Sequence, residues 1–389
     1  MTKKKILHIM SSYGGGISSF VRNLAREIDT TNYEFDVISF SDYSDDFVED
    51  IANTNGVCLK MPRPREKGYF YFFKETINLI DRNGPYDLVE SHFTGFYALA
   101  FKLICTITGN NRFVVHAHAT NDDLTDNLLN KTFRKISRWV TVSVATQLTS
   151  CSVMASEFMF GKKAVKNLNI VHIPNSISPN KYIYDFTEEQ IRQIKKENDI
   201  PLNKLIIGNI ARFNIQKNHQ FMIRLIKHLA KEGIDFVWIF IGSGELENDI
   251  MKQLDELNLN SYVCFLGRRE DVNILYSIMD VFVLPSFYEG LPTVVVEAQA
   301  AGVNSVISDN ITREVDLELD MVNYVSLESD LSVWADQIIQ AADKKAFPSE
   351  IRRQKISEKG FSNSMSAKLY QQFIDNEVST FRIGDKIII

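Results

Sequence analysis

The chain has 389 residues, of which 45% are hydrophobic and 24% are charged, and its formal net charge is −6 at pH 7. A chain of this length and composition is expected to form two globular domains of ordinary size. The negative net charge argues against a nucleic-acid-binding protein, because contacts to phosphate groups need a basic surface.

The apolar runs and the cysteines indicate the cellular compartment in which the protein is expected. No run approaches the roughly 18 uninterrupted apolar residues of a membrane-spanning helix, and the apolar stretch at residues 6–10 is too short for a signal peptide. We therefore expect a cytoplasmic protein. The four cysteines are widely spaced and form no Cys-x-x-Cys pair, so neither a zinc site nor a disulfide framework is predicted.

Strand-like and helix-like patterns alternate through the first half of the chain. The expected strands are residues 6–10, 35–40, 57–61, 88–91, 113–117, 140–144 and 170–173. A helix is expected to begin near Ile17, and further helices are expected at residues 69–81, 94–106 and 124–139. Such alternation predicts an α/β domain in which helices cover a parallel sheet.

The same alternation resumes after a charged helical segment at residues 188–198. The expected strands are residues 205–210, 236–241, 263–266, 281–284 and a strand ending at residue 307, and the expected helices are residues 218–231, 246–258, 272–279, 331–342 and 365–373. We place the domain boundary near Asp185. The resulting division is 1–185, 186–360, and a C-terminal helix and tail at 361–389.

The most informative stretch, residues 280–302, reads DVFVLPSFYEGLPTVVVEAQAAG. Its pattern predicts a buried strand, a polar loop and a helix that ends near Gly302. Pro292 and Thr293 fall where this helix would start, because proline suits the first helical position and threonine can cap it. The loop would then present backbone N–H groups around Gly290 and Leu291, and such a helix end binds anions.

Two carboxylates bracket this turn. Glu289 lies in the loop, and Glu297 follows eight positions later, about one turn inside the helix. A diphosphate on the helix end with a sugar hydroxyl on each carboxylate would suit this arrangement, because carboxylates accept from hydroxyls but repel phosphate. For an arbitrary pair of glutamates, two solvated side chains would be the simpler interpretation.

The residues around the two glutamates match a known pattern. Pro-Ser-x-x-Glu-Gly-Leu-Pro, then the second Glu and Ala-x-Ala-x-Gly, resembles the Glu-x7-Glu signature of retaining nucleotide-sugar glycosyltransferases with the GT-B fold, family 4 in particular. The resemblance, which extends to bacterial enzymes of exopolysaccharide and capsular polysaccharide synthesis, implies two facing Rossmann-like domains with a last helix that crosses back to the first. It also implies that Glu289 contacts the donor sugar and that Glu297 holds the ribose.

Two cations follow the first strand of the second domain. Arg212 and Lys217 lie beside the predicted phosphate site, although alone they could be solvated loop residues. They match the Arg-x4-Lys-Asn-His pattern of the family, which implies that they bind the diphosphate in place of a metal. No Asp-x-Asp triplet occurs in the chain. We therefore expect activity without a metal and without a cofactor, since the nucleotide-sugar is a substrate.

A glycine loop follows the first strand. Gly15 and Gly16 begin a Gly-Gly-Ile-Ser stretch that resembles the family loop over the donor phosphates and the acceptor, with Ser18 in place of the usual Glu. A dinucleotide fingerprint would need Gly-x-Gly-x-x-Gly and an acid at the end of the second strand, and neither is present. This argues against a dehydrogenase.

Two further stretches in the second domain resemble the family. Gly242 and Gly244 match its Gly-x-Gly-x-Leu motif and are expected to let a ligand approach the backbone. Arg268 follows a Phe-Leu-Gly stretch whose backbone meets the nucleotide base in the family. A surface position is the alternative for this arginine.

The strand expected at residues 113–117 leads into His116-Ala117-His118, at the edge where ligands bind in open α/β sheets. We expect the two histidines to face opposite sides, so that at most one points toward a ligand and no metal pair forms. The resemblance places His118 near the reacting sugar. A hydrogen-bonded structural histidine is the alternative.

Positive charge and large rings occur together in the first domain. Arg63, Arg65 and Lys67 precede an aromatic run that begins at Tyr69 and ends at Phe73. This combination is typical of interfacial membrane contact. A core helix preceded by a solvated loop would produce the same pattern, so peripheral attachment to the inner face of a membrane is one of two interpretations.

The resemblance implies a transferase that moves a sugar, with a UDP-sugar as the expected donor, to a saccharide or lipid-linked saccharide. Retention of configuration and a role in cell-surface polysaccharide synthesis are implied with it. Two alternatives stay open. A GT-B sugar-nucleotide epimerase would need no acceptor, and a non-catalytic sugar-nucleotide-binding protein would bind the donor without turnover.

Overall fold

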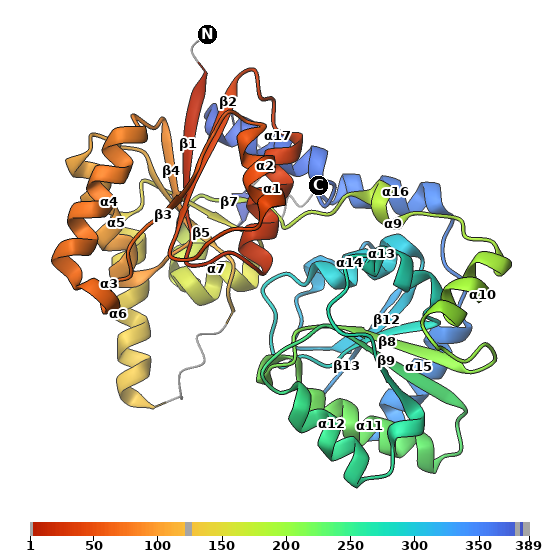
Figure 1. Cartoon of the computed structure of the whole chain (residues 1–389). Helices are drawn as coiled ribbons and strands as arrows, with labels where there is room; N and C mark the ends of the chain where they lie inside the picture. Colours follow the sequence, from red (N-terminus) through yellow and green to blue (C-terminus); the bar gives the residue numbers. More distant parts are fainter. Residues whose placement is uncertain (1–2, 121–126, 378–381, 384–389) are drawn as a thin grey trace. The chain divides into compact units, whose positions relative to one another are not determined.

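The computed structural model describes residues 3–120, 127–377 and 382–383 (Figure 1). The chain divides into two compact units, and each is built around its own sheet. The N-terminal unit comprises Met1–Ser176 together with Gly360–Ile389, and the C-terminal unit comprises Ile177–Lys359.

The N-terminal unit contains an eight-stranded sheet in the order β14-β7-β6-β5-β4-β1-β2-β3. Neighbouring strands are parallel except β14 and β7. The strand order reverses between β1 and β4, and ligands bind outside the carboxyl ends of the strands at such a point. The strands are β1 (Lys4–Ile9), β2 (Tyr33–Ser39), β3 (Cys58–Lys60), β4 (Leu88–Ser91), β5 (Phe113–Ala117), β6 (Gln147–Ser150), β7 (Ile170–His172) and β14 (Arg382–Ile383).

Helices from both ends of the chain pack on this sheet. Tyr370, Phe373 and Ile374 of the last helix share one core cluster with Phe20 and Phe35, so this helix belongs to the N-terminal unit (Figure 1). The helices are α1 (Gly16–Glu27), α2 (Asp45–Ala52), α3 (Pro64–Lys67), α4 (Tyr69–Asn83), α5 (Gly95–Ile107), α6 (Leu128–Val144), α7 (Val153–Phe160), α8 (Lys162–Asn167) and α17 (Asn363–Ile374).

The C-terminal unit contains a six-stranded parallel sheet in the order β10-β9-β8-β11-β12-β13. The sequences FVWIFI of β9 and VFVL of β11 are buried throughout. Parallel strands covered on both faces read as such continuous apolar runs, which is why these strands are visible in the sequence. The strands are β8 (Leu205–Ile210), β9 (Phe236–Ile241), β10 (Val263–Phe265), β11 (Val281–Leu284), β12 (Asn304–Ser308) and β13 (Val322–Val325).

Helices and short 3₁₀ turns alternate with these strands. They are α9 (Pro179–Tyr182), α10 (Glu188–Glu197), η1 (Ile215–Lys217), α11 (His219–Lys231), α12 (Glu247–Glu256), η2 (Asn260–Tyr262), α13 (Val272–Leu275), η3 (Tyr276–Ile278), α14 (Thr293–Ala301), η4 (Arg313–Val315), α15 (Leu331–Asp343) and α16 (Ser349–Glu358). The helix expected at residues 272–279 is therefore divided into α13 and η3. In both units the observed order is that of a Rossmann-like α/β domain.

The strand expected at residues 140–144 is wrong, because these residues form the last part of α6. Their sequence VTVSV is rich in β-branched residues and favours a strand locally. Packing overrides that preference: Val140 and Thr141 are buried, and the Thr141 hydroxyl accepts a 2.7 Å hydrogen bond from the Gly95 N–H at the start of α5. The strand follows instead as β6.

The division between the units lies between Ser176 and Ile177 rather than near Asp185. The physical reason is α9, which packs on α13 and α14 of the C-terminal unit. At the other end, the division between Lys359 and Gly360 is one residue from the expected position.

Candidate active site

Two loops of the C-terminal unit meet at the carboxyl edge of its sheet. Strands β8 and β11 are parallel neighbours, so the loops that follow them lie side by side. The Phe287 N–H donates to the Gln216 carbonyl at 2.9 Å, and the Asn218 side chain donates to the Pro285 carbonyl at 3.1 Å. These bonds fix the loop that carries Lys217 against the loop that carries Glu289.

Lys217 and Glu289 form an ion pair in this structure. The Lys217 Nζ lies 2.6 Å from the Glu289 Oε1, and only 16% and 7% of the two side chains are exposed. Gln216 Nε2 donates to the other carboxylate oxygen of Glu289 at 3.1 Å. The carboxylate is therefore held by two donors, and the three-proton ammonium of Lys217 keeps donors for a further anion.

Arg212 lies at the same edge but is far more exposed. Its guanidinium lies 3.1 Å from the carboxylate of Glu245, and 70% and 56% of these two side chains are exposed. Such surface pairs are weak, at about 0–1 kcal/mol. The pair therefore leaves Arg212 able to turn to a phosphate ligand.

Glu297 of α14 is surrounded by hydroxyl groups. The Tyr276 hydroxyl donates to Glu297 Oε2 at 3.3 Å, and Thr293 and Tyr182 also interact with the carboxyl group. Burial raises the pKa of Glu297, and hydrogen bonds from Tyr276, Thr293 and Tyr182 oppose the rise. A carboxylate in this setting is suited to accept from ligand hydroxyls.

The start of α14 differs in detail from the expectation. Pro292 occupies the N-cap position and Thr293 is the first helical residue, without a side-chain hydrogen bond that caps the helix. The threonine hydroxyl turns to Glu297 one turn later. Gly290 and the buried Leu291 directly precede the cap, and anion binding by their N–H groups stays a prediction.

The packing of the C-terminal unit itself explains why glycine is needed at two positions after β9. A Cβ on Gly242 would meet the Ala211 carbonyl oxygen at 2.0 Å, and a Cβ on Gly244 would meet the Phe213 carbonyl oxygen at 2.4 Å. The close approach at both glycines is therefore made by the backbone after β8. A ligand is not needed to explain them.

Arg268, expected near the nucleotide base, is an exposed residue after β10. The adjacent Arg269 is held by a bidentate pair with Asp271, with contacts of 2.8 and 2.6 Å. Arg268 is exposed beside this fixed pair, and its role near the base stays a prediction.

In the N-terminal unit, the glycine loop leads from β1 into α1. Gly15 has φ +96° and Gly14 has φ +100°, and a Cβ on Gly14, Gly15 or Gly16 would meet nothing within 4 Å. The Ser18 hydroxyl accepts from the Gly14 N–H and donates to the Gly15 carbonyl, each at 3.0 Å. Ser18 thus closes the loop on itself, and the face above the glycines stays open to a ligand.

The expectation that His116 and His118 face opposite sides is wrong. Their rings stack with centroids 4.2 Å apart and an interplanar angle of 12°, because residues two apart on a strand share a face. His118 Nε2 lies 2.9 Å from His92 Nδ1. Burial lowers the pKa of His118 well below its ordinary value, so the ring is neutral near pH 7.

Beneath His118 lies the buried carboxylate of Glu90 on β4. Its Oε1 is 3.2 Å from His116 Nδ1 and 3.0 Å from the Thr149 hydroxyl. Its Oε2 is 3.3 Å from His8 Nδ1 and 2.6 Å from the Tyr370 hydroxyl. Burial acts to raise the pKa of Glu90, but the hydrogen bond from His116 and the electrostatic interaction with that ring outweigh it and lower the pKa.

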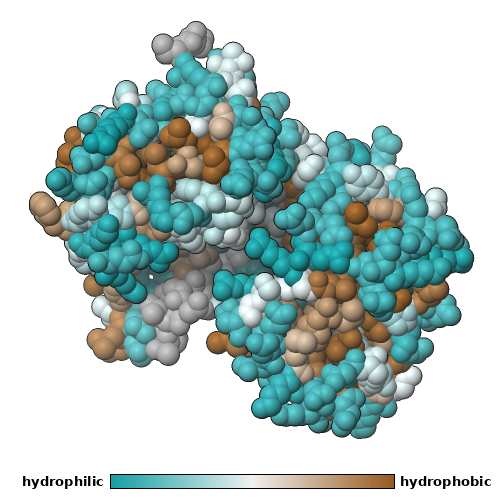
Figure 2. All heavy atoms as spheres, viewed as in Figure 1, coloured by the Kyte–Doolittle hydropathy of each residue, from teal (hydrophilic) through white to brown (hydrophobic). Residues whose placement is uncertain are grey.

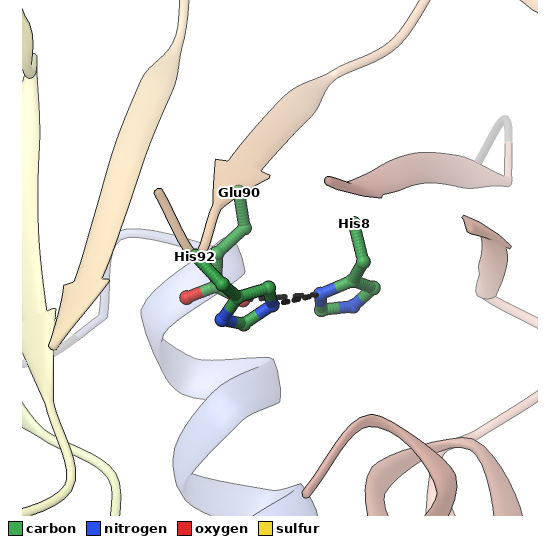
Figure 3. Close-up of side chains that lie close together, drawn as sticks. All are labelled: His8, Glu90 and His92. Atoms are coloured by element: carbon green, nitrogen blue, oxygen red, sulfur yellow. Dashed lines mark hydrogen bonds and ion pairs between the residues drawn. The ribbon is translucent and has the colours of Figure 1, made fainter. Parts of the chain in front are cut away.

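Figure 3 shows the Glu90 carboxylate and the His92 ring converging on one nitrogen of His8. Within the described part of the chain, these three residues have ligand atoms within 4.8 Å of one another, a spacing that a metal ion could use. His8 Nδ1 already contacts both of the others, Glu90 at 3.3 Å and His92 at 3.4 Å. The expectation of metal independence stays a prediction.

Sequence reasoning missed several residues that the structure brings to these sites. Tyr182 and Tyr276 reach Glu297 from α9 and η3, and His8, Glu90 and His92 support His118. Polar residues within apolar strands were the only available signal for His8 and Glu90. Nothing in the sequence marks the tyrosines.

The surface of the N-terminal unit carries apolar side chains between hydrophilic ones (Figure 2). In the aromatic run, Tyr69 and Phe70 are 66% and 85% exposed, whereas Phe72 is buried. One face of α4 therefore enters the core, as expected for a core helix, and the other face is open. Contact of that face with a membrane stays a prediction. Among the described residues, no helix is long and apolar enough to cross a membrane.

Comparisons with known proteins find glycosyltransferases for both halves of the chain. The family model Glycosyltransferase Family 4 matches residues 14–181, and the model Glycosyl transferases group 1 matches residues 190–361. The putative glycosyltransferase EpsF of Bacillus subtilis is 35% identical over 350 residues, which are 88% of each chain.

Two more distant proteins are also similar. UDP-Gal:α-D-GlcNAc-diphosphoundecaprenol α-1,3-galactosyltransferase of Escherichia coli is 22% identical over 266 residues, or 67% of each chain. The crystal structure of Anabaena HepE in complex with UDP has a TM-score of 0.75 at 17% identity, and the match covers 96% of this chain and all of that one. This likeness shows a shared fold of two Rossmann-like domains.

Proposed function

The chain belongs to glycosyltransferase family 4 and has the GT-B fold, and from that premise we propose that it transfers a sugar from a UDP-sugar to a saccharide or lipid-linked saccharide acceptor. Configuration at the reacting carbon would be retained, and the product would enter a cell-surface polysaccharide. The epimerase and the non-catalytic binding protein are not favoured, because the similar proteins are transferases.

The observation that carries the proposal is the cluster at the carboxyl edge of the C-terminal sheet. Lys217 and Glu289 are held together at 2.6 Å, and Arg212 lies on the same loop as Lys217. Glu297 lies on the helix that begins just beyond Glu289. Preorganised cations can stabilise the charge that develops on a departing diphosphate, at roughly 10²–10³ in rate for each well-placed donor.

The choice of UDP rests on similar proteins. HepE was crystallised with UDP and with UDP-glucose, and the name of the Escherichia coli enzyme gives UDP-Gal as its donor. The diphosphate of any nucleotide would meet the same cations. A preference for uridine would have to come from the part of the site near Arg268.

The N-terminal unit supplies a candidate acceptor site. A groove of about 610 Å³ lies beside α3 and α4, and its lining includes Tyr71, the cations Lys60, Arg63 and Lys67, and the acids Asp42, Glu66 and Glu75. The Lys67 Nζ lies 5.1 Å from the centroid of the Tyr71 ring. Lys60 is paired with Asp42, and Arg63 lies near Glu66. The aromatic face and the remaining cation, Lys67, suit an acceptor with sugar rings and an anionic group.

Exposed rings beside this groove support contact with a membrane surface, where a lipid-linked acceptor would be found. Tyr69 and Phe70 of α4 project near the cations of α3. In α6, Leu128, Leu129 and Trp139 are 80%, 81% and 69% exposed, and the helix contains no acidic residue. Apolar side chains among cations favour an anionic bilayer interface.

A donor panel tests the proposal. UDP-, GDP- and ADP-sugars are added singly and the thermal unfolding midpoint is measured, since a ligand at 100 times its dissociation constant adds about 2.7 kcal/mol to stability. The stabilising donor is then incubated with lipid-linked saccharides, and release of the nucleoside diphosphate is followed. Stabilisation by a UDP-sugar with acceptor-dependent release is the expected result. Epimerised donor without an acceptor would reject transfer in favour of epimerisation.

A further inference from the structure

A buried chain of polar side chains connects Glu90 to His118. Glu90 and His8 are completely buried, and His92 is 7% exposed. Contacts of 3.3, 3.4 and 2.9 Å lead from Glu90 to His8, from His8 to His92, and from His92 to His118. His8, Glu90 and His92 lie at the carboxyl ends of β1 and β4 (Figure 3), between which the strand order reverses, and His118 directly follows β5.

The position of each proton follows from Glu90. An ionised carboxylate only accepts hydrogen bonds, so the His8 nitrogen that faces it must carry a proton. The nitrogen in question is Nδ1, which also faces His92 Nε2. Because a protonated Nδ1 has no lone pair to offer, His92 Nε2 must be the acceptor and carry no proton.

The same reasoning continues to His118. A neutral imidazole has one protonated nitrogen, so the proton of His92 lies on Nδ1. That nitrogen lies 2.9 Å from His118 Nε2, which must then accept. The proton of a neutral His118 is left on Nδ1. Burial supports neutral rings throughout, since it lowers the pKa of His8 to about 4 and lowers the pKa of His92 and His118 well below the ordinary value.

We propose that Glu90, acting through His8 and His92, is a positioning group that fixes the orientation of His118 and keeps its proton on Nδ1. The Nε2 of His118 is then occupied and cannot take a proton from a substrate, and its protonated Nδ1 is itself buried. The catalytic consequence rests on the proposed function and on the expectation that His118 lies near the transferred sugar. The tautomer itself does not depend on that function.

Nuclear magnetic resonance of the wild-type protein tests the tautomer directly. In protein labelled with ¹⁵N-histidine, long-range proton–nitrogen correlations distinguish a protonated ring nitrogen from an unprotonated one. The His118 signals are identified by their absence from His118→Ala. The expected result near pH 7 is a protonated Nδ1 and an unprotonated Nε2 at His118. A proton on Nε2 would overturn the proposal without any variant of the network.

The variant His92→Phe removes the donor to His118 while keeping a ring of similar size. We expect His118 to lose its single tautomer in this variant, and we expect turnover to fall about 10- to 100-fold because a small misplacement of a catalytic group has that effect. The Michaelis constant for the donor should change little. Thr76→Val is the matched control, since it changes a buried threonine of α4 that takes no part in this chain of contacts and should keep the tautomer and rate of the wild type.

A double-mutant cycle separates positioning from an independent structural effect. If His92 acts only through His118, His92→Phe combined with His118→Ala should turn over no more slowly than His118→Ala alone. If the double variant loses turnover by the product of the two single losses, the proposal is wrong. It is also wrong if the purified wild type contains stoichiometric zinc and His92→Phe does not. Failure of all transfer activity would remove the proposed function, but the resonance experiment would still decide the tautomer.

Discussion

Lys217 Nζ lies 2.6 Å from Glu289 Oε1, so the cation expected on the diphosphate and the carboxylate expected on the sugar are already paired. The pair orients both groups before a donor arrives. An ammonium with three protons can hold the carboxylate and one phosphate oxygen together. The diphosphate and the sugar of the proposed donor would therefore bind to two groups whose relative position is already fixed.

Lys217→Ala and Arg212→Ala should each lower turnover by about 10²-fold, yet only the first should also destabilise the C-terminal unit. Removing Lys217 leaves Glu289, 7% exposed, without its cation, and losing a charged hydrogen bond costs about 1.5–3 kcal/mol. Arg212 is 70% exposed and its pair with Glu245 adds little. Steady-state rates and thermal unfolding measure the two effects.

Lys204→Ala is the control for that comparison. Lys204 directly precedes β8 and pairs with Asp235 at 3.1 Å, so it lies at the opposite edge of the sheet. Its turnover should match the wild type. Normal rates in either Arg212→Ala or Lys217→Ala would remove the phosphate role from that residue.

The C-terminal site could be anticipated because its parts are local in sequence. The residues from β11 to α14 form one strand, loop and helix, and the apolar run and the prolines mark their boundaries. The relative placement of Lys217 and Glu289 needed only the pairing of β8 with β11. The roles of these residues stay predictions.

The N-terminal network could not be anticipated, because it needs the order of the strands. His8, Glu90 and His118 are far apart in sequence and meet only because β1, β4 and β5 are neighbours. Tyr370 joins them from α17, near the end of the chain. The strand expected at residues 140–144 failed for a related reason, since contact with α5 outweighed the local preference of β-branched residues.

Chelation should leave activity intact. The chain contains no Asp-x-Asp triplet, and the proposed stabilisation of the diphosphate comes from Arg212 and Lys217. Rates after dialysis against EDTA should equal those with added Mg²⁺ or Mn²⁺. If activity disappears on chelation and returns with either ion, then a metal ion stabilises the diphosphate in place of Arg212 and Lys217.

Binding to anionic vesicles should depend on the open face of α4. Replacing Tyr69 and Phe70 together by serine removes two rings that are 66% and 85% exposed and should lower co-sedimentation with vesicles containing phosphatidylglycerol. Val57→Ser, at a residue 42% exposed outside the aromatic run, should bind as the wild type does. Equal binding by all three proteins would exclude this face as the contact.

Stability should fall when the pH drops from about 6.5 to about 4. Burial lowers the pKa of His8, His172 and His219 to about 4, whereas the unfolded chain binds protons near pH 6.5. Within that window the unfolded state takes up more protons, so each histidine contributes up to about 1.4 kcal/mol of destabilisation per pH unit. Above pH 6.5 these histidines do not make the free energy of unfolding depend on pH.

Thermal unfolding across this pH range measures the loss. His219→Phe is the informative variant, because the ring stacks on Phe213 with centroids 4.4 Å apart and phenylalanine can keep that packing without titrating. The unfolding midpoint of the variant should vary less with pH than that of the wild type. If the pH dependence of the unfolding midpoint is unchanged in this variant, then His219 does not contribute to it.

The two carboxylates of the donor site should fail differently, because they are proposed to contact different parts of one ligand. Glu297 lies inside α14 among the hydroxyls of Tyr276, Thr293 and Tyr182, and it is proposed to accept from ribose hydroxyls that bind alike in the ground and transition states. Glu297→Gln should therefore weaken the nucleotide-sugar and the free nucleoside diphosphate together, by about 1.5–3 kcal/mol. Because burial raises the pKa of Glu297, wild-type affinity should also fall as the pH drops toward that raised value.

Glu289 is proposed to contact the sugar that reacts, so Glu289→Gln should lower turnover while the nucleoside diphosphate still binds. Its pair with Lys217 would be weakened but Gln216 would keep a partner, so the loop should stay in place. Calorimetry with the diphosphate, beside steady-state rates for both variants, separates the two roles. If both variants lose diphosphate affinity equally, or neither does, then the assignment of Glu289 to the sugar and Glu297 to the ribose is wrong.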